Sequence, residues 1–147
     1  MQKVQSYNTA IARKKASAPL RYLEEKGLLR GSILDYGCGK GADYNHLCKV
    51  GYKSMAYDPY WRPTDLAGLK FDTILCTYVL NVVGEDSGSE IINSIKSLLN
   101  KDGQAFLSVR RDIKKDGKTS RGFQRNVKLD LEVVKEAGGY CIYRLSN

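Results

Sequence analysis

The fold is decided by the stretch ILDYGCGKG at residues 33–41. A short apolar run leads here into three glycines at alternate positions, and helical spacing of apolar residues follows over 42–50. Glycine lets the main chain turn sharply and approach a ligand closely, and the free N–H groups that open a helix attract a carboxylate or a phosphate. The stretch therefore predicts a buried strand over 32–36, a ligand-binding glycine loop and a helix over 42–50.

Working outward, the same reading predicts an α/β fold with a parallel sheet, helices on both faces and an antiparallel pair of edge strands. A capping-box spacing at residues 87–90 precedes one amphipathic helix. The predicted helices cover 9–16, 17–27, 42–50, the segment from 87 to 99, and 130–137. The predicted strands cover 32–36, 53–57, 71–77, 104–109, 123–128 and 140–145, with loops over 59–70 and 110–122.

An acid ends the second strand at the distance expected of a ribose-binding carboxylate. Asp58 lies 21 residues after Gly37, close to the offset of about 20 residues found in nucleotide-binding units. Gly37, Gly39 and Ala42 also satisfy the dinucleotide fingerprint. Asp35 argues against that ligand, because its charge repels a pyrophosphate and suits the ammonium of a methionine moiety. A dinucleotide site and a glycine turn without a ligand remain the alternatives.

The chain resembles the class I methyltransferases that depend on S-adenosylmethionine (SAM). The resemblance rests on residues 33–41, on Asp58 and on residues 71–75, and it covers about residues 31–110. It implies a Rossmann-like sheet, SAM as cofactor, and a binding site made of Asp35, Gly37, Cys38, Gly39, Gly41, Asp58, Pro59, Tyr60 and Thr77. Only 12 residues separate Asp58 from Phe71, too few for the usual helix and strand, so we expect a trimmed sheet.

A narrower likeness points to the methyltransferases associated with DNA phosphorothioation and to their phage relatives. It rests on Thr9-Ala10-Ile11 with Arg13, on Pro19 and Arg21, on Asp58-Pro59-Tyr60, and on Tyr78-Val79-Leu80-Asn81-Val82.

The loop after the third strand is expected to face the transferred methyl group. Tyr78 and Asn81 are its polar residues and the predicted catalytic pair, with Asn81 orienting an acceptor amine or hydroxyl. The alternative is that Tyr78 packs on the cofactor and Asn81 caps a turn. We expect His46, in mid-helix, to be a surface residue, and one histidine with four scattered cysteines makes a metal site improbable.

Positive charge is concentrated in two segments. The chain carries a net charge of +8, of which residues 1–30 hold +5 and residues 110–128 hold +6. Such a field attracts polyanions, so we expect a nucleic-acid or nucleotide substrate, and solvated basic surfaces are the alternative. The predicted substrate-binding residues are Arg13, Lys14, Arg110, Arg111, Arg121, Gln124 and Arg125.

The 147 residues suit a single SAM-binding domain, with residues 1–30 as a basic helical extension and 110–128 as a basic loop. No signal peptide or membrane span is expected, and the unpaired cysteine pattern favours the cytoplasm. Three rival functions remain: a methyltransferase for a small molecule or a protein, a non-catalytic nucleic-acid-binding module of the same fold, and a small NAD-binding protein.

Overall fold

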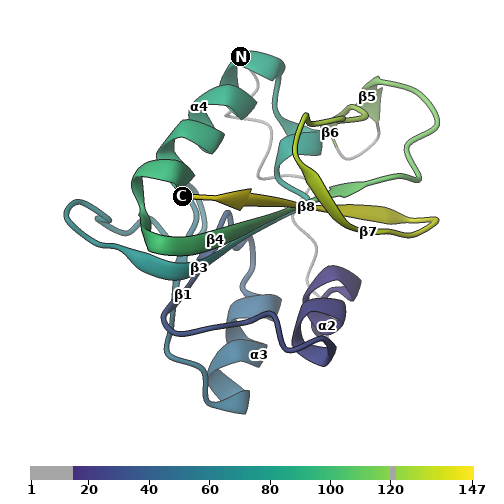
Figure 1. The fold of residues 1–147 in the computed structure, drawn as a ribbon. Helices are drawn as coiled ribbons and strands as arrows, with labels where there is room; N and C mark the ends of the chain where they lie inside the picture. The colour runs from purple at the N-terminus through teal and green to yellow at the C-terminus, as the bar shows by residue number, and fades with distance from the viewer. Residues whose placement is uncertain (1–14, 120–121) are drawn as a thin grey trace.

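The computed structural model describes residues 15–119 and 122–147, which form a six-stranded sheet, a small hairpin and covering helices (Figure 1). The helices are α2 Ala18–Glu25, α3 Ala42–Val50 and α4 Glu85–Ser97, with a 3-10 turn η2 at Leu80–Val82. The sheet contains β1 Ile33–Tyr36, β2 Ser54–Tyr57, β3 Phe71–Thr77, β4 Leu99–Arg110, β7 Glu132–Glu136 and β8 Tyr140–Ser146. The hairpin pairs β5 Gly117–Thr119 with β6 Gly122–Gln124. The helix predicted over 9–16 lies almost entirely outside the described residues.

The sheet order β2-β1-β3-β4-β8-β7 places the glycine loop at a topological switch point. Strands β2, β1, β3 and β4 are parallel, whereas β8 and β7 are antiparallel to their neighbours. The chain leaves β1 toward β2 and later returns to β3 on the other side of β1. Ligands of open α/β sheets bind outside the carboxyl ends of strands at such a point. The predicted α/β class, with its antiparallel edge pair, is confirmed.

The sheet ends at β2 within the described residues, as the short 59–70 segment predicted. Asp58 and Arg62 exchange two main-chain hydrogen bonds of 2.9 and 3.1 Å directly after β2. The Thr64 hydroxyl then donates to the Ala56 carbonyl at 3.2 Å. This turn satisfies part of the β2 edge that a further strand would otherwise cover.

Helices cover both faces of the sheet, as predicted. Helices α2 and α3 lie on one face and α4 lies on the other (Figure 1). Because successive strand residues point to opposite faces, neighbours separate into two cores: Leu34 packs in the α4 core, and Ile33 packs with Phe106 in the core beside α2 and α3. No helix in the described part of the chain is long and apolar enough to cross a membrane.

The helix predicted over 130–137 is wrong, because this segment forms strand β7. Residues 132–136 pair with β8 through a tight turn, in which the Ala137 N–H donates to the Tyr140 carbonyl at 2.8 Å. Two valines inside β7 favour the extended form, and pairing with β8 decides it. The antiparallel edge pair therefore forms here, and not from the strand predicted over 123–128, of which only the start is extended in β6.

Three boundaries also differ from the prediction. Helix α4 begins at Glu85 with Gly84 as N-cap, so the spacing at 87–90 lies inside the helix and does not cap it. Strand β4 begins at Leu99 and therefore includes residues 102–103, which were predicted as a turn. At this point the pairing of β4 with β3 shifts in register. The predicted loop over 110–122 contains the hairpin strand β5.

The register shift depends on the close packing of Gly103. A Cβ at this position would lie 2.9 Å from the Asn100 carbonyl and 3.0 Å from that of Phe71. We expect Gly103→Ala to lower the free energy of unfolding by about 1–3 kcal/mol, because the main chain must shift. Gly138→Ala is the control, since nothing lies within 4 Å of its Cβ, and it should change stability by less than about 0.5 kcal/mol. Chemical denaturation measures both, and equal effects would contradict this account.

Candidate functional site

The glycine loop is held against strand β2 and against the loop that follows β3. The N–H groups of Gly37 and Cys38 both donate to the Tyr57 carbonyl, at 2.7 and 2.9 Å. Gly37 has φ +82°, and a Cβ on it would overlap the Val79 side chain. Only glycine allows both this dihedral angle and this contact. Gly39 and Gly41 also have positive φ, at 56° and 92°.

Asp58 links the glycine loop to the turn of residues 58–62, which follows the edge strand β2. Its Oδ2 accepts the Gly39 N–H at 2.9 Å, and its Oδ1 accepts the N–H groups of Tyr60 and Trp61, each at 2.9 Å. Each carboxylate oxygen has more than one lone pair, so the group retains capacity to accept a ligand hydroxyl. The predicted ribose acid therefore stands beside the predicted loop.

Asp35, at the end of β1, is a buried acid with an unused oxygen. The residue is 3% exposed, and its Oδ2 has no hydrogen-bond partner. Burial raises the pKa of Asp35 well above its usual value, and the charges of Asp43 and Asp58 raise it further, whereas a bond from the Tyr44 N–H opposes the shift. A buried acid in negative surroundings favours a cationic partner.

Asp43 belongs to this group of acids, and the sequence analysis missed it. It lies in the first turn of α3, is 8% exposed, and accepts both the N–H and the hydroxyl of Ser17 at 2.7 Å. An acid in the first turn of a helix is commonly a surface residue that complements the helix dipole. Only the packing of α2 on α3 reveals its burial.

Cys38 does not supply a nucleophile in this loop. Burial, with the charges of Asp35 and Asp58, raises the pKa of its thiol to about 12. The thiol therefore stays neutral near pH 7, and a neutral thiol is a poor nucleophile.

The residues after β3 combine a strained turn with a buried amide. Thr77 ends the strand, and Tyr78 follows with φ 62° and donates its N–H to the Ser108 carbonyl at 2.8 Å. A tyrosine with positive φ is uncommon and often marks a functional turn. A direct catalytic role of Tyr78 stays a prediction.

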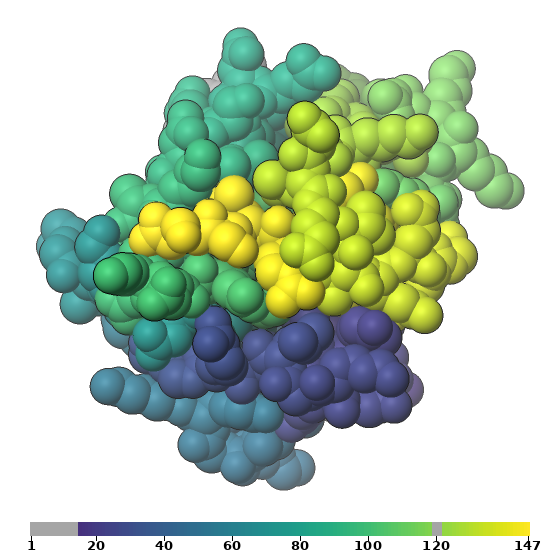
Figure 2. Space-filling view, viewed as in Figure 1, coloured from purple at the N-terminus to yellow at the C-terminus, as the bar shows by residue number. Residues whose placement is uncertain are grey.

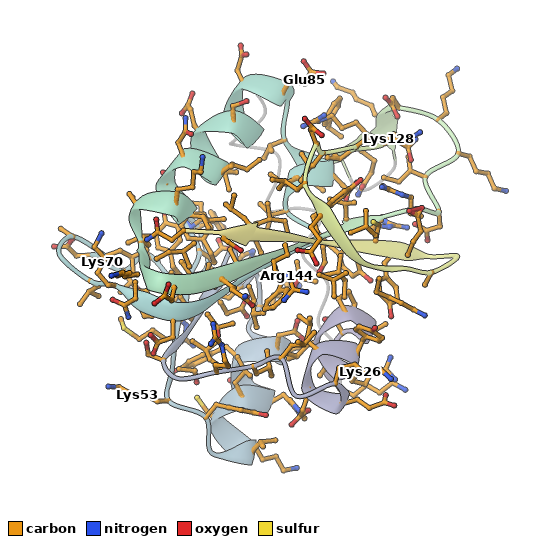
Figure 3. The ribbon with its side chains drawn as sticks, in the orientation of Figure 1. Lys26, Lys53, Lys70, Glu85, Lys128 and Arg144 are labelled. Atoms are coloured by element: carbon orange, nitrogen blue, oxygen red, sulfur yellow. The ribbon has the colours of Figure 1, made fainter. Side chains whose placement is uncertain are left out.

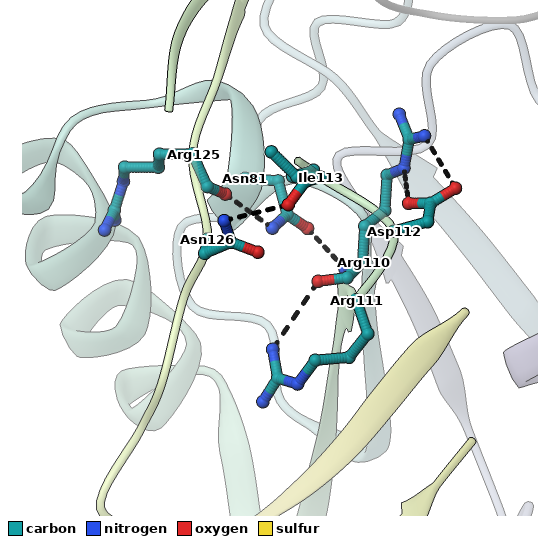
Figure 4. Close-up of polar contacts among 7 residues, drawn as sticks. All are labelled: Asn81, Arg110, Arg111, Asp112, Ile113, Arg125 and Asn126. Atoms are coloured by element: carbon teal, nitrogen blue, oxygen red, sulfur yellow. Dashed lines mark hydrogen bonds and ion pairs between the residues drawn. The ribbon is translucent and has the colours of Figure 1, made fainter. Parts of the chain in front are cut away.

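Asn81 is fully buried and joins three segments of the chain (Figure 4). Its Nδ2 donates to the Arg125 carbonyl at 2.8 Å, and its Oδ1 accepts the Arg110 N–H at 2.7 Å. The Arg125 N–H returns a bond to the Asn81 carbonyl at 2.8 Å. This arrangement gives Asn81 a structural role, and its predicted contact with a methyl acceptor stays a prediction.

Aromatic residues surround the outer side of the glycine loop. Tyr60 and Trp61 are 55% and 41% exposed and stack edge to face, with ring centroids 4.9 Å apart. The Lys40 ammonium lies 5.2 Å from the Trp61 ring. Pro59 is exposed in the same turn. These side chains flank Asp58, where the sequence placed the cofactor.

The predicted substrate arginines that the structure describes make bonds within the protein (Figure 4). Arg110 forms two bonds of 2.8 and 2.9 Å with Asp112. Arg111 donates to the Val127 carbonyl and the Tyr143 hydroxyl, both at 2.7 Å, and Arg125 donates to the Val83 carbonyl at 2.7 Å. Arg111 and Arg125 thus anchor the 110–128 segment to the body of the protein, whereas the bonds of Arg110 lie within the segment.

The remaining predicted substrate residues divide into two groups. Gln124 is 8% exposed, and its Oε1 has no hydrogen-bond partner. Arg13, Lys14 and Arg121 lie outside the described residues.

The residues at the switch point fit the cofactor that the resemblance implied. The unpartnered Asp35 Oδ2 suits the ammonium of SAM, the Gly37 loop allows close approach, and Asp58 suits ribose hydroxyls. Within residues 15–119 and 122–147, no group of three or more histidine, cysteine or acidic side chains is arranged to hold a metal ion.

A family model described as a methyltransferase domain matches residues 7–142. The chain therefore belongs to this methyltransferase family. No curated protein matches it in sequence.

Solved structures share this fold at low sequence identity. A 1,6-didemethyltoxoflavin-N1-methyltransferase from Burkholderia thailandensis, solved with its substrate and S-adenosylhomocysteine, is 20% identical with TM-score 0.64, over 88% of this chain and 76% of that one. A SAM-dependent methyltransferase from Bacteroides fragilis, solved with S-adenosylhomocysteine, is 18% identical with TM-score 0.63, over 90% and 78%. A protein of echinomycin biosynthesis is 21% identical with TM-score 0.54 over 67% of this chain, which spans about half (51%) of that protein.

The contact between Gly37 and Val79 makes a specific prediction about ligand binding. We expect Gly37→Ala to weaken binding of S-adenosylhomocysteine by about tenfold or more, because a displacement of the loop by roughly one ångström is costly. Gly51→Ala is the control, since Gly51 also has positive φ but has nothing within 4 Å of its Cβ. Both variants carry backbone strain, so calorimetric titration should separate them by affinity, and equal affinities would contradict this role of Gly37.

Proposed function

We propose that this SAM-dependent methyltransferase acts on a nucleic acid or a nucleotide. The supporting observation is the division of basic side chains in the 110–128 segment. Arg110, Arg111 and Arg125 bond to the protein itself, whereas the lysines of the segment are exposed and, within the described residues, form no ion pair. These lysines are Lys114, Lys115, Lys118 and Lys128.

The segment presents these lysines on a supported projection. Residues 112–118 extend beyond the rest of the surface (Figure 2). The Asn126 amide donates to the Ile113 carbonyl at 3.1 Å and to Asp116 at 3.0 Å, which closes the base of the projection. Both acids of the segment are occupied by internal bonds, Asp112 by Arg110 and Asp116 by Asn126. An exposed set of ammonium groups steers and binds phosphates without reading sequence.

The proposed cofactor contacts follow from the site. We assign the ammonium to Asp35, the ribose hydroxyls to Asp58, and the adenine to the Tyr60 and Trp61 side. SAM supplies an already activated methyl group, so the protein contributes mainly alignment and the exclusion of water. The loop from Thr77 to Asn81 then faces the acceptor, with Asn81 fixing the arginine-anchored segment beside it.

The proposal includes one domain and a cytoplasmic location. The four free cysteines, two of them buried, support a reducing compartment. The narrower likeness to methyltransferases of DNA phosphorothioation supports the same class of substrate.

The cofactor contacts are tested by titration of S-adenosylhomocysteine into Asp58→Ala. We expect a loss of affinity of about 10- to 100-fold, because charge-assisted hydrogen bonds are removed. Asp65→Ala is the matched control: Asp65 is exposed in the same segment and also accepts a main-chain N–H, from Ala67 at 3.0 Å. Undiminished binding by Asp58→Ala would overturn the ribose assignment.

The nucleic-acid substrate is tested by oligonucleotide binding at about 50 and about 200 mM salt, where phosphate contacts weaken strongly. Replacing Lys114, Lys115 and Lys118 together by Gln should reduce the slope of log K against log salt by about 2–3.

The control triple replaces Lys26, Lys53 and Lys70 by Gln, which changes the net charge equally on the side away from Lys128 (Figure 3). An equal loss in both triples would indicate a general charge effect. Absence of oligonucleotide binding at either salt concentration would favour a small-molecule substrate, as in the toxoflavin methyltransferase. Oligonucleotide binding without S-adenosylhomocysteine binding would favour a non-catalytic module.

A further inference from the structure

Two buried acids lie near the start of α3, and the charge of one of them, Asp43, raises the pKa of the other, Asp35. Asp35 is the next-to-last residue of β1 and has an unpartnered oxygen, and Asp43 lies in the first turn of the helix. Both are less than a tenth exposed. Neither forms an ion pair with a cation within the described residues. Burying two charges of like sign close together is costly, and such pairs commonly share one proton.

Asp43 is the member of the pair whose charge the protein supports. Its two oxygens accept the Ser17 N–H and hydroxyl, each at 2.7 Å. It also lies at the amino end of a nine-residue helix, where the helix dipole favours an anion. Ser17 is itself the N-cap of α2, whose Leu20 N–H donates to the Ser17 hydroxyl at 3.4 Å. Helix α2 thus holds Asp43 in place.

Asp35 has little comparable support. One main-chain N–H, from Tyr44, favours its charged form. The groups that face it are Asp43 and Tyr44 from α3, Asp58 after β2, Cys38 from the glycine loop and Cys76 from β3. Among residues 15–119 and 122–147 none of these groups is a cation, so the proton is placed on Asp35.

We propose that Asp35 holds a proton in the ligand-free site and releases it to solvent when the ammonium of the cofactor binds. The proposal rests on the assignment of that ammonium to Asp35. No covalent bond changes except the O–H bond of the Asp35 carboxyl, whose proton passes to the buffer. The resulting carboxylate pairs with the ammonium, and Asp43 acts as the positioning residue that keeps the proton on Asp35 until then.

The direction of the pH dependence follows from the raised pKa of Asp35. The ligand-free fold binds a proton that the unfolded chain has lost, so stability falls as pH rises from the unfolded pKa toward the folded one. Cofactor affinity rises with pH over the same interval, because less free energy is needed to remove the proton from Asp35.

The test is calorimetric titration of S-adenosylhomocysteine near pH 6, in buffers that differ in ionisation enthalpy. We expect the observed heat to depend on the buffer in the direction of net proton release. Asp43→Asn should bind the ligand and release fewer protons at the same pH, because Asp35 then ionises more readily. Asp130→Asn, at an exposed position, should behave as the unchanged protein.

Three outcomes are distinguishable. Binding with buffer-independent heat overturns the proton release and leaves the cofactor site standing. Absence of binding to the folded protein overturns the cofactor assignment as well. Proton release that persists unchanged in Asp43→Asn overturns the role of Asp43.

A second measurement does not require the ligand. Urea denaturation of the ligand-free protein between about pH 4 and pH 7 should show Asp35→Asn gaining stability relative to the unchanged protein as pH rises. Where the folded protein holds one proton more than the unfolded chain, the ratio of the unfolding constants of Asp35→Asn and the unchanged protein changes tenfold per pH unit. A constant ratio across the interval would overturn the stored proton.

Discussion

The absence of a side chain at residue 37 is the constraint on which the site depends. It lets the loop after β1 lie directly against Val79, in the loop after β3. The first loop carries the glycines of the proposed cofactor site, and the second carries Tyr78 and Asn81. The two loops belong to adjacent parallel strands, so their contact closes the switch point where ligands of this fold bind.

In the 110–128 segment, after β4, the arginines bond to the protein and the lysines are exposed. Three arginines, which a charge count treats as ligands for an anion, are used to hold main-chain carbonyls, a tyrosine hydroxyl and one aspartate. A guanidinium has five donors in a fixed fork and suits this role, whereas lysine is a flexible point charge that remains in solvent. The proposed substrate surface is thus made of lysines. The arginines hold the segment that carries these lysines beside the loop from Thr77 to Asn81.

The acids at the proposed cofactor site form a local conflict in the ligand-free protein. A buried, unpartnered carboxyl beside two other carboxylates destabilises the ligand-free protein. The same group is an effective partner for a cation that arrives with the ligand. Sites that bind charged ligands commonly carry such local conflicts, which the ligand then relieves.

Local sequence determined the parts of this protein whose cause is local. The glycine loop, helix 42–50 and strand 71–77 were predictable, because turn chemistry and apolar periodicity over a few residues specify them. The shortened edge after β2 followed from the 12 residues available before Phe71. Tertiary structure decided the rest. Residues 132–136 became a strand because β8 offered an edge, and Asp43 became a buried acid because Ser17 from α2 covers it. Arg111 and Arg125 bond to carbonyl groups that lie 16 and 42 residues away in the sequence. A local sequence pattern cannot predict such contacts, because they form only when the chain has folded.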